Sequence, residues 1–103
     1  MNEFLDQPLK VIAAALKNGE TTSVALVTDC LERIDRVNPD LNAVVSMATD
    51  LALKHAAKAD ADSASGQTTG PLHGIPMTIK DSLDTFDMVT TWGTQGRQQF
   101  RPG

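Results

Sequence analysis

Residues 70–81 read GPLHGIPMTIKD, and this stretch decides how the fold is interpreted. Glycines and prolines lead into a short apolar run that ends in Lys80 and Asp81. Along a strand, alternation of side chains would place Ile75 and Ile79 on one face and Lys80 on the opposite face. The stretch therefore predicts a strand that presents one lysine at its end.

Two roles for Lys80 are compatible with this strand. A lysine on a free sheet edge discourages pairing with other chains, and the strand pattern taken alone favours that role. Gly74 allows close backbone approach and Pro76 stiffens the lead-in, which indicates a positioned lysine instead. A neutral lysine amine can accept the proton of a serine nucleophile in acyl transfer. Lys80 is thus the candidate catalytic residue, supported by Gly74, Pro76 and Asp81, whose carboxylate would accept hydrogen bonds from the turn that follows.

Helices are predicted upstream, in a region that extends over about residues 8–62. Apolar residues at helical spacing and a stop at Gly19 predict the first helix over residues 8–18. Thr21, Thr22 and Ser23 offer N-caps for a second helix that ends at Asn38-Pro39. Its expected buried stripe consists of Val24, Val27, Leu31, Ile34 and Val37.

A further strand and a third helix are expected between the second helix and the lysine strand. Residues 41–47 have the β-branched character of a short strand. Alanine-rich residues 49–61 favour a helix, but Asp60 and Asp62 near its end oppose the helix dipole and predict fraying. Residues 63–70 form a polar linker, and the lysine strand with its following loop occupies about residues 71–103. The predicted class is therefore α/β.

Composition excludes several classes of function. The chain has 103 residues, a net charge of -4 and no basic cluster, which argues against direct nucleic-acid binding. No apolar run approaches the roughly 20 residues that span a bilayer. The first residues lack the basic and apolar regions of a secretory signal, so a cytoplasmic location is expected. Cys30 has no second cysteine to pair with and is interpreted as a packing residue.

Other polar residues are weaker candidates for chemistry. Asp81, Asp84 and Asp87 lack the glycine and distal glutamate of a calcium loop, so no metal and no cofactor are predicted. His73 is interpreted as a packing or backbone hydrogen-bonding residue, and His55 as a surface or packing residue. Ser46 and Ser82 stand in no nucleophile motif. Trp92 either lines an acyl pocket or packs.

The stretch at residues 70–81, with Thr90-Thr91 ten residues further on, resembles the amidase signature family. Thr22-Ser23-Val24, Asn38-Pro39 and Leu41-Asn42-Ala43 resemble the N-terminal helical region of that family in order and spacing. The resemblance covers nearly the whole chain. Its most specific element is the core Gly-Ile-Pro-x-x-x-Lys-Asp, which begins at Gly74.

This resemblance implies that residues 1–103 are the N-terminal part of a single domain with a mixed sheet, incomplete here. It implies a hydrolase that converts a small carboxamide to a carboxylic acid and ammonia or an amine. Lys80 matches the family's catalytic lysine, while the nucleophilic serine and the bridging serine in a cis peptide have no counterpart here. The alternatives are the amide-hydrolysing subunit of a tRNA-dependent amidotransferase and a stand-alone, non-catalytic helical interaction module. The oligomeric state stays open, with a homodimer as one option.

Overall fold

The computed structural model describes residues 3–68, 70–80 and 83 of the chain. Its elements are a short 3-10 helix η1 (Glu3–Asp6) and the helices α1 (Leu9–Lys17), α2 (Ser23–Leu41) and α3 (Thr49–Ala64). The chain divides into two compact units, of which the first comprises Met1–Val44 and Thr49–Pro76. The second comprises Val45–Ala48 and Met77–Gly103. All four helical elements belong to the first unit.

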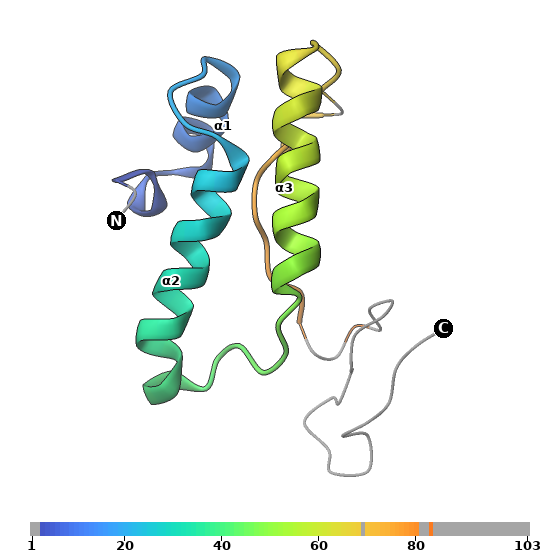
Figure 1. Ribbon diagram of the computed structural model, residues 1–103. Coiled ribbons are helices and arrows are strands. Elements are labelled where there is room, and N and C mark those ends of the chain that lie inside the picture. Colours follow the sequence, from blue (N-terminus) through green and yellow to red (C-terminus); the bar gives the residue numbers. More distant parts are fainter. Residues whose placement is uncertain (1–2, 69, 81–82, 84–103) are drawn as a thin grey trace. The chain divides into compact units, whose positions relative to one another are not determined.

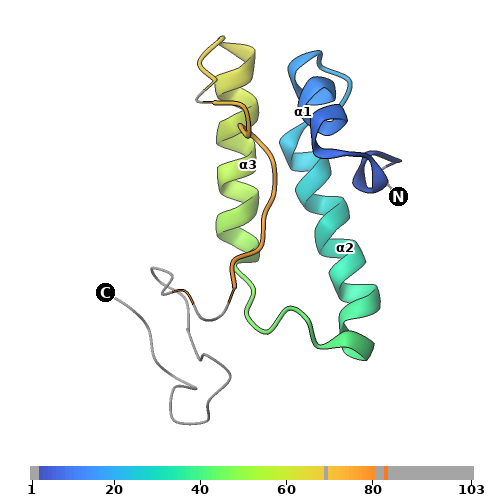
Figure 2. The same cartoon turned by 180° about the vertical axis from the view of Figure 1, so that it is seen from behind.

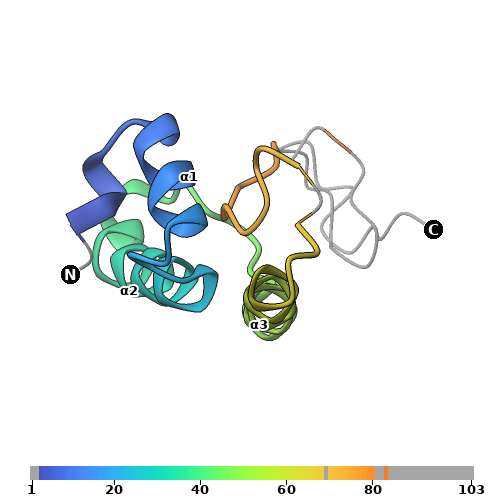
Figure 3. The same cartoon turned by 90° about the horizontal axis from the view of Figure 1, so that it is seen from above.

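Helices α2 and α3 lie side by side in antiparallel directions in the first unit (Figures 1 and 2). Viewed from above, nearly along these two helices, α1 lies on the α2 side (Figure 3). The buried apolar side chains among the described residues are Ala15, Leu26, Val27 and Ala56. The core thus consists of small and medium side chains between the helices. No helix in the described part is both long and apolar enough to cross a membrane.

The second helix begins as predicted but ends later. The Thr22 side chain caps it by accepting a hydrogen bond from the Ala25 N–H (3.1 Å). The prediction that it ends at Asn38-Pro39 is wrong, because Pro39 lies inside the last turn and the helix continues to Leu41. Asn42 then terminates it in the left-handed conformation, with its N–H donating to the Asn38 carbonyl.

The buried face of α2 agrees only in part with the predicted stripe, since Val27 is buried but Val24 and Val37 are exposed. Ser23, Leu26 and Val27 are buried, whereas Val24 is 36% exposed. The periodicity of the apolar residues located the helix correctly. It identified Val27 as buried but not Ser23, a polar residue whose hydroxyl and N–H are hydrogen-bonded in the interior.

The third helix runs past its predicted end at residue 61 to Ala64, so the polar linker is shorter than predicted. Its last turns carry an ion pair between Lys58 Nζ and Asp62 Oδ2 at 2.7 Å. The Ser65 hydroxyl donates to the Asp62 carbonyl and extends the hydrogen bonding beyond the last turn. The helix therefore continues beyond residue 61 despite the acidic residues Asp60 and Asp62.

Both predicted strands are absent from the described residues. Residues 42–48 and 75–80 are neither helix nor strand, and residues 71–74 form a turn. A strand is defined by a ladder of backbone hydrogen bonds to a neighbour, and no such ladder reaches either segment in the described part. The Val44 backbone is instead bonded to a side chain, since Asn38 Nδ2 donates to its carbonyl and Asn38 Oδ1 accepts from its N–H, both at 2.8 Å. The described part is consequently helical, without the strands of the α/β prediction.

Candidate functional site

Lys80 belongs to the second unit and is exposed. Its carbonyl accepts a hydrogen bond from the Leu83 N–H at 2.9 Å. Gly74 and Pro76 belong to the first unit, at the end of the segment that leads toward Lys80. Asp81, together with Asp84 and Asp87, lies outside the described residues. Of the candidate site, the structure therefore describes the side chain of Lys80 and the backbone segment that precedes it.

This approach, residues 70–76, is called the lead-in here. The His73 N–H donates to the Gly70 carbonyl (3.2 Å), and the Ile75 N–H donates to the Leu72 carbonyl (3.1 Å). Gly74 has a φ of +80°, a region that other residues avoid because of their Cβ. A Cβ on Gly74 would also lie 3.4 Å from the Ser23 Cβ. The positive φ of the turn therefore favours glycine here, and a Cβ would be in van der Waals contact with α2.

Ser23 connects the lead-in to α2. Its hydroxyl donates to the Gly74 carbonyl at 2.7 Å, and the residue is only 3% exposed. A buried carbonyl without a donor costs about 1–3 kcal/mol, so this bond satisfies a group that the turn would otherwise leave unpaired. The sequence indicates Ser23 only as a candidate N-cap of the second helix. Its actual partner lies 51 residues further along the chain.

Asp60 of α3 binds the same end of α2. Its Oδ1 accepts from the Ser23 N–H at 2.7 Å, and its Oδ2 accepts from the Val24 N–H at 3.0 Å. The first N–H groups of a helix have no partner within the helix, and the N-terminus carries partial positive charge. A carboxylate at this position satisfies two donors and interacts favourably with the dipole. In the sequence, Asp60 is recognisable only as a negative charge that opposes the dipole of α3 near its C-terminus. Nothing in the sequence indicates that it faces the N-terminus of α2.

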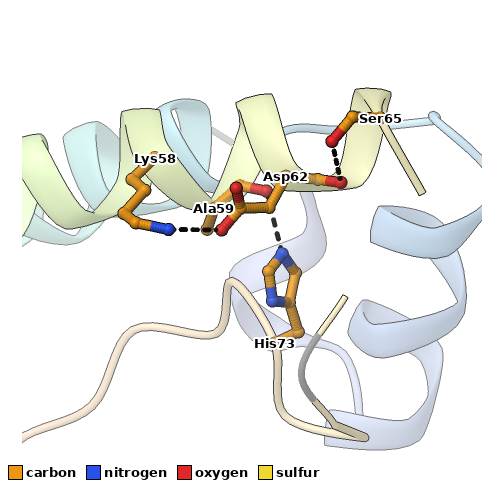
Figure 4. Close-up of polar contacts among 5 residues, drawn as sticks. All are labelled: Lys58, Ala59, Asp62, Ser65 and His73. Atoms are coloured by element: carbon orange, nitrogen blue, oxygen red, sulfur yellow. Dashed lines mark hydrogen bonds and ion pairs between the residues drawn. The ribbon is translucent and has the colours of Figure 1, made fainter. Parts of the chain in front are cut away.

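His73 connects the lead-in to α3. Its Nε2 lies 2.8 Å from the Ala59 carbonyl oxygen, one residue before Asp60 (Figure 4). A carbonyl oxygen only accepts hydrogen bonds, so this geometry requires the proton on Nε2. The predicted role of His73 in a backbone hydrogen bond is confirmed. His55, in contrast, is exposed on α3, which agrees with a surface role.

The remaining titratable candidate is Cys30 on α2. Burial raises the pKa of its thiol, so the neutral form is favoured. A neutral, partly buried thiol is a poor nucleophile. This agrees with its interpretation as a packing residue.

Comparisons with known proteins place this arrangement in context. A family model described as Amidase matches residues 25–103. The glutamyl-tRNA(Gln) amidotransferase A subunit of Lachnospira eligens is 37% identical over 99 residues, covering 96% of this chain and 21% of the relative. The corresponding protein of Rhodopirellula baltica is 38% identical over 91 residues, covering 88% of this chain and 18% of the relative.

The chain is also similar to a solved structure. The native peptide amidase from Stenotrophomonas maltophilia is 35% identical, with a TM-score of 0.90 over 97% of this chain and 21% of that protein. The chain thus spans about a fifth of the length of the relatives that it matches.

Proposed function

The chain belongs to the amidase signature family, and from this premise we propose that it is the N-terminal part of an enzyme that hydrolyses a carboxamide to a carboxylic acid and ammonia or an amine. The observation that carries the proposal is the family match over residues 25–103, which includes the lead-in and Lys80. Relatives named as a peptide amidase and as amidotransferase subunits support cleavage of a C–N bond.

In the proposed reaction Lys80 is the general base of a Ser-cisSer-Lys site. A serine hydroxyl attacks the amide carbonyl carbon while its proton passes through the bridging serine to Lys80 Nζ. The same proton is then delivered to the leaving nitrogen as the C–N bond breaks, and water hydrolyses the acyl ester that remains. Both serines belong to sequence outside residues 1–103, so this chain supplies the base and its approach. Gly74 and Pro76 support the base through the backbone, and Asp81 is proposed to orient it.

The test is amide hydrolysis by the complete protein that carries residues 1–103. Lys80→Ala should lower kcat by at least about 100-fold, which is the usual contribution of a positioned general base. Lys58→Ala is the matched control, because Lys58 is an exposed lysine whose amine pairs with Asp62 on the same helix. Its kcat should be unchanged. Near-normal turnover by purified, folded Lys80→Ala protein would remove Lys80 from the mechanism.

A second candidate is the amide-hydrolysing subunit of a tRNA-dependent amidotransferase, which passes the released ammonia to a partner subunit. The observation that favours it is the name of the curated relatives, which are amidotransferase A subunits at 37% and 38% identity. Genes for partner subunits beside this one, and formation of a stable complex with their products, would support it. Efficient hydrolysis of simple amides by the protein alone would favour the free-standing amidase.

A further inference from the structure

Two hydrogen-bonding side chains join the lead-in to α2 and α3, and a third joins α3 to α2. The Ser23 hydroxyl binds the Gly74 carbonyl, the Asp60 carboxylate binds the backbone N–H groups of Ser23 and Val24, and the His73 ring binds the Ala59 carbonyl. Their lengths lie between 2.7 and 3.0 Å. We call Ser23, Asp60 and His73 the clamp.

The clamp forms a continuous connection from α3 through α2 to the lead-in. Asp60 fixes the first backbone N–H of α2, and the hydroxyl of that same residue, Ser23, fixes Gly74. Asp60 also lies in the C-terminal half of α3, where a negative charge is unfavourable to that helix. An acidic residue at this position is explained by its favourable contact with the N-terminus of α2, which lies in the same unit.

The last two residues of the lead-in have a restricted backbone. Ile75 precedes a proline, which restricts it to extended backbone, and the ring of Pro76 fixes its own φ. Lys80 lies four residues after Pro76, so it stays within about 14 Å of the point where the lead-in ends. The three clamp residues therefore act on the backbone that precedes residues 77–80 and the Lys80 amine.

We propose that Ser23, Asp60 and His73 are positioning residues for Lys80. They hold the Gly70–Pro76 turn against α2 and α3, and so fix the backbone from which residues 77–80 continue. This inference rests on the proposed function, in which Lys80 is the base. Proton transfer depends steeply on distance, and a displacement of about 1 Å costs on the order of 100-fold in rate. The clamp thus acts on turnover through the backbone and not through contact with the substrate.

The test compares two neighbouring substitutions in the complete protein. Ser23→Ala removes the bond to Gly74 but keeps the Ser23 backbone N–H that binds Asp60. Thr22→Ala removes the cap bond to Ala25 but leaves the bond to Gly74 in place. Ser23→Ala should lower kcat by about 10–100-fold with KM within about twofold. Thr22→Ala should lower thermal stability and leave kcat unchanged, and an equal loss of kcat in both would overturn the proposal.

A matched pair on α3 repeats the comparison. Asp60→Ala should lower kcat as Ser23→Ala does, whereas Asp62→Ala removes only the exposed bond to Lys58 and should have no effect. If Lys80→Ala retains activity, the assignment of Lys80 as the base fails, whatever the state of the clamp. The clamp is still tested by amide hydrogen exchange, because protection of the His73 and Ile75 N–H groups should fall roughly tenfold in Ser23→Ala and not in Thr22→Ala. Unchanged protection in Ser23→Ala would overturn the clamp.

Discussion

Among single residues, Gly74 shows how backbone conformation and packing act together. Its φ of +80° is disfavoured for any residue with a Cβ, and a Cβ there would also contact Ser23 and the Leu16 side chain at 3.4–3.7 Å. Gly70, at the other end of the turn, has no left-handed φ, and a Cβ added to it would meet no atom within 4 Å. The two glycines of one motif therefore have different physical roles.

Gly74→Ala should lower the free energy of unfolding by about 1–2 kcal/mol, the cost of a left-handed conformation in a residue other than glycine. Urea unfolding followed by circular dichroism measures this change. Gly70→Ala is the control, and it should be neutral or slightly stabilising, since alanine reduces the entropy of the unfolded chain without straining the folded one. Equal effects of the two substitutions would show that the turn does not depend on the conformation of Gly74.

Among the elements, the three helices were predictable because their apolar spacing and caps are local signals. Thr22 caps α2 as expected, and Gly19 has the positive φ of a helix stop. The end of α2 was mispredicted because Pro39 removes only its own backbone hydrogen bond, and the residues after it remain helical to Leu41. The bonds of Ser23, Asp60 and Asn38 were not predicted, since each joins groups whose proximity is a result of the fold.

Asn38 is the residue that organises the end of α2. Its amide makes two hydrogen bonds to the backbone of Val44, which replace the ladder partner that a strand would have there. Val44 is the last residue of the first unit before Val45–Ala48, just as Pro76 is the last before Met77. The chain thus leaves the first unit twice, after Val44 and after Pro76. In both cases a side chain of α2 bonds the backbone nearby, Asn38 at Val44 and Ser23 at Gly74.

Asn38→Ala should lower the free energy of unfolding by about 1 kcal/mol. Two lost hydrogen bonds cost roughly 1–3 kcal/mol, and the better helix propensity of alanine returns about 0.5 kcal/mol. Asp40→Ala, two residues later in the same turn, is the control, because Asp40 is exposed and an acidic side chain is unfavourable at a helix C-terminus. Its thermal midpoint should be unchanged or slightly higher. A loss in Asp40→Ala as large as that in Asn38→Ala would argue against the Val44 bonds.

At the scale of the molecule, many large apolar side chains of the described residues are exposed. The buried apolar residues in the described part include no aromatic residue, and Leu26 is the largest of them. Met77 is 79% exposed, and Leu41, Leu72 and Leu83 are 59–67% exposed. Large exposed apolar side chains are typical of surfaces that another part of a protein covers. Relatives about five times as long as this chain carry further sequence that we expect to cover them.

The isolated 103-residue polypeptide should therefore be marginally stable, prone to self-association and inactive as an amidase. Its core is small, its extended segments lack ladder partners in the described part, and a base without a nucleophile cannot carry out acyl transfer. Sedimentation should show concentration-dependent association, and binding of a hydrophobic dye should exceed that of the complete protein, which serves as the control. Amide hydrolysis should stay at the rate of buffer alone. A cooperative thermal transition of a stable monomer would contradict the first expectation, and turnover that disappears in Lys80→Ala would contradict the second.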